Sequence, residues 1–68
     1  MDAETFNMSI RKFLKMVGVS SQHEIEQAVA RAMADGHLKG TEKLPVKMQL
    51  TVGSVHLDVS FDSVLELS

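Results

Sequence analysis

The first part of the chain carries apolar residues at the spacing of one face of an α-helix. Between Thr5 and Val17 the apolar positions are Phe6, Ile10, Phe13, Leu14 and Val17. Asp2 or Thr5 is suited to cap the start of such a helix, and Gly18 to end it, because glycine accepts the left-handed conformation past a helix end. The pattern predicts a helix over residues 5–17.

A second helical pattern follows after three or four residues. Ser21 and Glu24 have the spacing of a capping box, in which a hydroxyl and a carboxylate satisfy the first backbone N–H groups. Asp35-Gly36 marks the end, with Gly36 in the left-handed conformation. The apolar positions between these signals are Ile25, Ala28, Val29, Ala32 and Met33. We therefore expect two helices joined by a short corner.

Beyond a connector at residues 37–45, the apolar residues alternate with polar ones. This period of two indicates β-strands at residues 46–52 and 55–61. The Gly53-Ser54 pair between them predicts a two-residue hairpin turn, which would place Val52 opposite Val55. A second turn at Asp62-Ser63 would lead to a third strand at residues 64–67, whose register stays open.

These elements predict an α+β fold in one domain covering residues 1–68. A two-helix hairpin would pack on one face of a two- or three-stranded antiparallel β-meander. Burying each large apolar side chain would contribute about 1.5–3 kcal/mol. The predicted core is Phe6, Ile10, Phe13, Leu14, Val17, Ile25, Val29, Ala32, Met48, Leu50, Val52, Val55, Leu57, Val59 and Phe61.

Composition limits the classes of function. The 68-residue chain has a net charge of −2 and no Cys, which excludes disulfides and thiolate metal ligands. The charge gives no electrostatic footprint for nucleic acid or an anionic membrane. No apolar run is long enough to span a membrane, and the acidic N-terminus does not resemble a secretory signal. We expect a cytoplasmic protein.

No catalytic, cofactor-binding or metal-binding set emerges from the sequence. The histidines His23, His37 and His56 lack the spacing of known ligand patterns. His56 and Asp58 would share the solvent face of a strand, which is one ligand short of a site. Serines and carboxylates fall at predicted caps, turns and exposed faces, and a domain of this size has little room for a substrate pocket. We expect neither an enzyme nor a small-molecule substrate.

Two binding functions remain. The first is a non-catalytic protein-interaction or self-associating module, with an unknown protein partner or as a homodimer, since a small sheet offers open edges. The alternative is a winged-helix-like nucleic-acid-binding domain that uses Arg11, Lys12 and Lys15 on the first helix. Glu24 and Glu26 on the second helix oppose that alternative because they repel phosphate.

The chain also resembles a known family. The block FNMSIRKFLK, followed by VGV, SQ and EIE, then ADG and an alternating hairpin, resembles a family of short uncharacterised bacterial proteins over nearly the whole chain. The resemblance implies a bacterial origin and a small α+β domain. It implies no activity.

Overall fold

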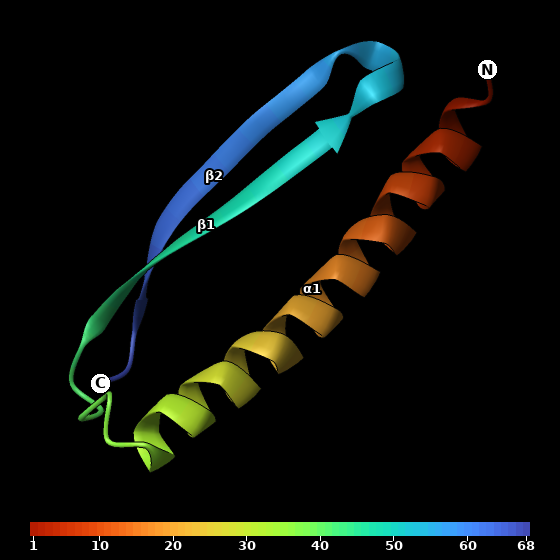
Figure 1. Ribbon diagram of the computed structural model, residues 1–68. Helices are drawn as coiled ribbons and strands as arrows, with labels where there is room; N and C mark the ends of the chain where they lie inside the picture. Colours follow the sequence, from red (N-terminus) through yellow and green to blue (C-terminus); the bar gives the residue numbers. More distant parts are fainter. The chain divides into compact units, whose positions relative to one another are not determined.

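The N-terminal half of the chain is one continuous helix, α1, from Ala3 to Ala34 (Figure 1). It is seen in a computed structural model that describes all 68 residues. Asp2 caps its start, because one carboxylate oxygen accepts hydrogen bonds from the backbone N–H groups of Glu4 at 2.9 Å and Thr5 at 3.3 Å. The cap satisfies two of the N–H groups that a helix start leaves unpaired.

The predicted break into two helices is wrong. Gly18 lies in the helix interior, and Ser21 and Glu24 are helical residues rather than a capping box. A glycine in a helix costs only about 1 kcal/mol relative to alanine. Ending one helix there and starting another would leave about four carbonyl and four N–H groups without helical partners. The apolar spacing also runs on without a shift through Val17, Ser21 and Ile25.

The predicted end of the helical region is confirmed. Gly36 has φ 77°, in the left-handed region that favours glycine. The N–H of His37 donates to the carbonyl of Ala32 at 2.9 Å, and that of Gly36 to Met33 at 3.2 Å. These two bonds are the Schellman motif, which satisfies carbonyls that the last helical turn leaves free.

Strand β1 runs from Lys43 to Val52 and pairs antiparallel with strand β2, from Leu57 to Glu66. The expected connector at residues 37–45 is therefore too long, because Lys43, Leu44 and Pro45 already belong to β1. Proline is tolerated there because each strand of a two-stranded sheet has a free edge, where a missing N–H breaks no pairing.

The hairpin turn differs from the predicted two-residue loop. A 3-10 turn, η1, covers Gly53–Val55, and His56 follows in the left-handed conformation with φ 55°. The N–H of His56 donates to the carbonyl of Gly53 at 3.2 Å. Val52 therefore pairs with Leu57 rather than with Val55. The turn is of the type I-based, longer class of hairpin loops.

No third strand is present, and Asp62-Ser63 is not a turn. Both residues lie within β2, where Asp62 pairs with Lys47 and Ser63 with Val46. The alternation of apolar and polar residues continues through Ser63 to Leu65, so one long strand explains the tail without a bulge. The predicted two- or three-stranded meander is a two-stranded hairpin.

The chain forms two compact units, residues 1–37 and 38–68. The expected α+β class is correct at this coarse level. The predicted core is not found as a buried core, since no side chain in the chain falls in the buried range. Phe6 is 52% exposed, Phe13 47% and Phe61 60%.

Candidate interaction surfaces

The helix carries one long apolar surface, which we call the helix stripe. Its positions are separated by four, four and three residues, a spacing that repeats every eleven residues and stays on one side of the helix. The helix stripe consists of Phe6, Ile10, Leu14, Val17, Ser21, Ile25, Ala28 and Ala32, with Phe13 and Val29 along its edges. It runs almost the full length of α1, because the helix is not interrupted at Gly18.

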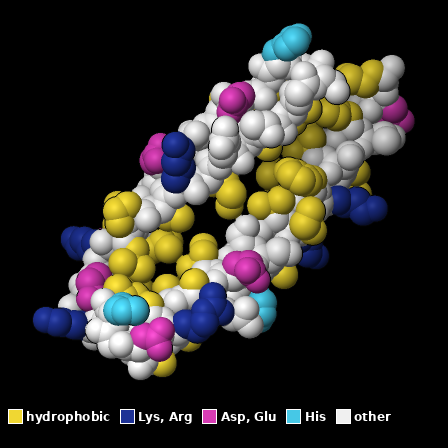
Figure 2. Space-filling model, viewed as in Figure 1, with side chains coloured by type: hydrophobic (Ala, Val, Ile, Leu, Met, Phe, Trp, Pro, Cys, Tyr) yellow, Lys and Arg dark blue, Asp and Glu magenta, His cyan; other side chains and the backbone are white.

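The hairpin has an equally consistent apolar side, which we call the hairpin face. Directly paired residues of antiparallel strands point to the same side of a sheet. The pairs on this side are Leu44–Leu65, Val46–Ser63, Met48–Phe61, Leu50–Val59 and Val52–Leu57. Only Ser63 is polar. Figure 2 shows hydrophobic side chains in rows along both the helix and the hairpin.

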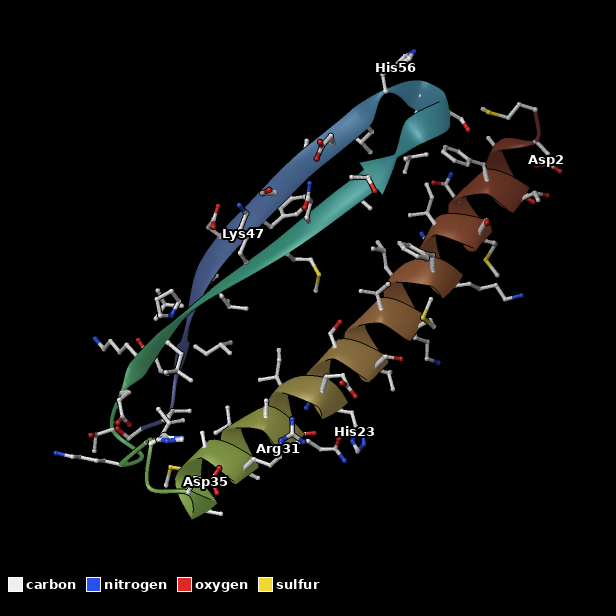
Figure 3. The ribbon with its side chains drawn as sticks, in the orientation of Figure 1. Asp2, His23, Arg31, Asp35, Lys47 and His56 are labelled. Atoms are coloured by element: carbon white, nitrogen blue, oxygen red, sulfur yellow. The ribbon has the colours of Figure 1, made fainter.

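The other side of the hairpin is mostly polar and charged. Lys43 lies opposite Glu66 and Lys47 opposite Asp62. The Gln49 side-chain amide donates to the Asp58 carboxylate at 3.0 Å. Figure 3 shows Lys47 on this hairpin and His56 at its tip. The contrast between the two sides is typical of a sheet with one side covered and one in water.

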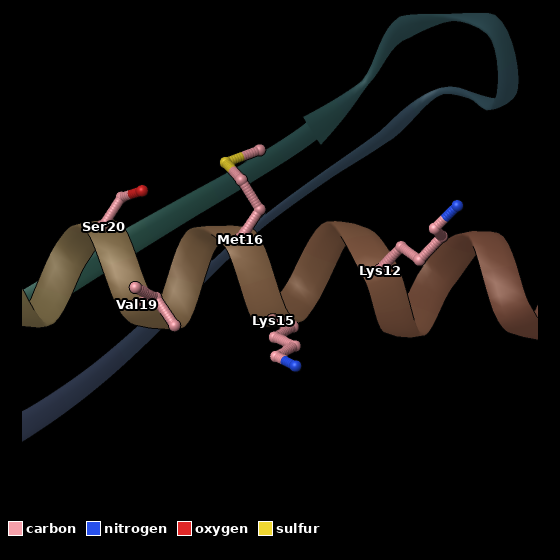
Figure 4. A pocket seen from close by; sticks show the side chains of 5 residues that line it. All are labelled: Lys12, Lys15, Met16, Val19 and Ser20. Atoms are coloured by element: carbon pink, nitrogen blue, oxygen red, sulfur yellow. The ribbon is translucent and has the colours of Figure 1, made fainter.

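The basic residues of the alternative function, Arg11, Lys12 and Lys15, are all exposed on α1. Figure 4 shows that Lys12 and Lys15 project in different directions. They border a shallow depression with Met16, Val19 and Ser20. This depression is formed by one helix alone, so it has no opposing wall that would enclose a ligand.

A second depression also lies on the helix alone. It is lined by Glu4, Asn7, Met8 and Arg11. The helix corner needed for a winged-helix domain is absent, because α1 is continuous from Ala3 to Ala34. The structure therefore lacks the helix–turn–helix corner that would present a recognition helix to nucleic acid. The three basic residues also do not line a common groove.

The histidines are not brought together. His23 is on the helix, His37 follows the helix end, and His56 is in the hairpin turn. The expectation that His56 and Asp58 share a strand face is wrong, because His56 precedes β2 and has a left-handed backbone. No group of three or more His, Cys, Asp or Glu side chains is placed to hold a metal ion.

One polar feature was missed by sequence reasoning. The Glu42 carboxylate accepts hydrogen bonds from the backbone N–H groups of Lys39 at 2.8 Å, Gly40 at 3.0 Å and Thr41 at 3.2 Å. These hydrogen bonds, above all the one from Lys39, hold the pKa of Glu42 below its ordinary value. Gly40 has φ 98°, which turns these groups toward one carboxylate. In the sequence, the only sign of this loop is a glutamate, Glu42, placed two residues after a glycine, Gly40.

These contacts make the Glu42 loop a structural turn rather than a site. Three backbone donors converge as in an anion-binding nest, but the chain's own carboxylate fills it. The Asp2 carboxylate likewise accepts hydrogen bonds from the backbone N–H groups of Thr5 and Glu4, which lower its pKa. Both carboxylates stabilise chain ends of regular elements. The arrangement offers no nucleophile, base or oxyanion hole in a common cleft.

Comparison with known proteins shows the family of the chain. The chain belongs to the family described as "Family of unknown function (DUF6494)", which matches residues 1–68. The predicted resemblance to an uncharacterised family is confirmed. No curated protein and no solved structure matches the chain. No stretch of α1 is apolar enough for the helix to cross a membrane.

Proposed function

We propose that this chain is a non-catalytic interaction module that self-associates through its apolar surfaces. The observation that carries the proposal is that the helix and the hairpin each present one continuous apolar row on one side. Scattered exposed apolar residues are normal on a protein surface. Continuous rows along a whole helix and a whole hairpin are typical of surfaces that meet another surface.

Energetics support the same conclusion. Helices in proteins gain most of their stability from packing an amphipathic face, and an isolated two-stranded hairpin is marginal in water. Covering one large apolar side chain contributes about 1.5–3 kcal/mol. Phe6, Phe13 and Phe61 each leave about half or more of their surface exposed. A second chain that covers them would contribute this stabilisation.

The direct test measures molar mass and thermal unfolding across a hundredfold range of chain concentration. We expect a stable dimer or larger assembly whose unfolding temperature rises with concentration, because mass action favours the associated state. A monomeric mass throughout, with a concentration-independent and cooperative unfolding transition, would mean that the apolar surfaces are satisfied within one chain and would refute the proposal.

A pair of substitutions at neighbouring positions of β2 tests the surface itself. Val59 belongs to the hairpin face, and Ser60 lies on the polar side. Val59→Lys places a charge on the apolar side, so we expect dissociation to become at least about tenfold easier, or more than about 1.4 kcal/mol. Ser60→Lys adds the same group to the polar side and should leave the assembly within about twofold. Equal effects of the two variants would contradict an apolar interface on that face.

A further inference from the structure

The helix stripe changes in side-chain size along its length. Its N-terminal half holds large residues, Phe6, Ile10 and Leu14, and Phe13 borders it. Its C-terminal half holds small ones, Ser21, Ala28 and Ala32, with Ile25 as the only large member on the stripe. The side chains of the stripe therefore project far from the helix axis at its N-terminal end and less far at its C-terminal end. A partner surface that keeps a constant distance from the helix axis must have small side chains opposite the large ones and large side chains opposite the small ones.

A second copy of the same helix has this arrangement when it runs in the opposite direction. We propose that two α1 helices pair antiparallel along their stripes, about a two-fold axis near residue 19, and this proposal rests on the self-association proposed above. In this register Phe6 faces Ala32 of the second copy, Ile10 faces Ala28, and Val17 faces Ser21. Large side chains then meet small ones at these three levels, as even packing requires, whereas Phe13 and Leu14 meet Ile25.

The parallel arrangement fails on the same residues. It places Phe6 against Phe6 and Ala32 against Ala32, so the helix axes would have to spread at one end and close at the other. Helices pack with axes about 8–10 Å apart, at a distance set by the side chains in contact. A helix pair with two phenylalanines at one end and two alanines at the other does not keep one such distance.

Charge follows the same gradient. Residues 3–18 hold three basic and one acidic side chain, for a net charge of +2. Residues 19–34 hold one basic and two acidic side chains, for a net charge of −1 with His23 neutral. The antiparallel pair puts the basic half beside the acidic half and also opposes the two helix dipoles. The parallel pair puts like charge beside like charge.

The spacing keeps the two surfaces in register over the whole contact. A repeat of eleven residues corresponds to about 3.67 residues per turn, close to the 3.6 of a straight helix. The stripe therefore drifts little around α1, and the seam extends about 39 Å from Phe6 to Ala32 at 1.5 Å per residue. An isologous contact of this kind is closed by its two-fold axis and does not grow into fibres.

Spin labels on single cysteines measure the orientation directly, because the natural chain has no Cys. Ser9, Ser20 and Ala30 are exposed positions off the stripe. In the antiparallel pair, the distance between equivalent residues along the axis grows by about 3 Å for each residue from the midpoint. Labels at Ser20 should be closest, and those at Ser9 and Ala30 should be similar to each other and about 15–20 Å farther apart.

The other outcomes separate this inference from the proposed function. Equal separations at the three positions would show a parallel pair and overturn the antiparallel arrangement. A dimeric mass with a large separation at Ser20 would place the interface elsewhere, such as on the free hairpin edges, and would overturn the helix pairing but not self-association. A monomeric mass with no dipolar coupling would overturn both.

A swap of side chains tests the facing pair of Ile10 and Ala28. Ile10→Ala leaves a gap at both symmetry-related contacts, so we expect dissociation to become easier by about tenfold or more. Adding Ala28→Ile returns the missing volume from the other chain and should restore the affinity to within about threefold. The matched control adds Ala30→Ile, which lies off the stripe and should give no rescue. If the Ile10→Ala, Ala28→Ile chain is no tighter than Ile10→Ala alone, the facing register is wrong.

Discussion

The continuity of α1 at Gly18 leads to a prediction with a definite sign. Gly18 is in the helix interior, and a Cβ atom built on it meets no atom within 4 Å. Alanine is more stable than glycine at such a position by about 0.8–1.0 kcal/mol. Since no neighbour opposes the new methyl group, Gly18→Ala should stabilise the chain by about 1 kcal/mol. That gain corresponds to a roughly fivefold smaller unfolding constant.

If the helix ended at Gly18 instead, the same substitution would have the opposite effect. A left-handed glycine replaced by alanine costs about 1–2 kcal/mol. Gly36, with φ 77°, provides the matched control, and Gly36→Ala should destabilise the chain. Denaturant unfolding followed by helical circular dichroism, at one fixed chain concentration, measures both variants. A loss of stability in Gly18→Ala would refute the continuous helix.

The hairpin turn and the Glu42 loop give two more predictions. His56 has a left-handed backbone, so His56→Gly should stabilise the hairpin by up to about 1 kcal/mol in thermal unfolding, and His56→Val should destabilise it, because a β-branched residue resists φ near 55°. The pKa of Glu42 is lowered in the folded chain, so its stabilising effect is present above its unfolded value of about 4.3 and is lost as the pH falls through the folded pKa. Glu42→Gln should remove part of the acid sensitivity of unfolding and speed amide hydrogen exchange at Lys39 and Gly40. Glu26→Gln, a substitution on the helix, should leave the exchange at Lys39 and Gly40 unchanged. A wild-type rate at Lys39 in Glu42→Gln would contradict the role of the carboxylate.

The sequence was sufficient to identify most of the helical and extended residues, but it wrongly predicted an interruption of the helix at Gly18. Gly18 and the Ser21–Glu24 pair are local signals, each worth on the order of 1 kcal/mol. Breaking a helix costs more, since backbone groups on both sides of the break lose their partners. The constant spacing of Val17, Ser21 and Ile25 was the signal for a single helix.

The hairpin error has a different origin. Val52 pairs with Leu57 instead of Val55, which shifts the register by two residues. A shift of two keeps Leu57, Val59 and Phe61 on the side of the sheet where they were predicted. The alternating pattern therefore cannot distinguish the two registers. The turn decides between them, and the left-handed conformation of His56 is unusual enough that composition did not suggest it.

The candidate surfaces were predictable to different degrees. Strand alternation indicated most of the hairpin face, although Val55 leaves that row and lies in the turn at 67% exposure. The basic residues Arg11, Lys12 and Lys15 are exposed as expected, but the corner that gave them a nucleic-acid function does not exist. Glu42 was missed because its role depends on the backbone of Lys39 and Gly40, which side-chain patterns do not reveal.

The wrong two-helix prediction and the proposed dimer would bring the same parts of the helix stripe together. A helical hairpin bent at Gly18 would bring the large half of the helix stripe against its small half within one chain. Because α1 is continuous, Phe6 and Ala32 lie at opposite ends of a helix and do not meet in one chain. An antiparallel second copy restores the same contacts between chains, as happens when two copies of a hairpin exchange identical arms. The stripe residues that a bent helical hairpin would bring together within one chain are therefore the ones that favour pairing between two copies of the continuous helix.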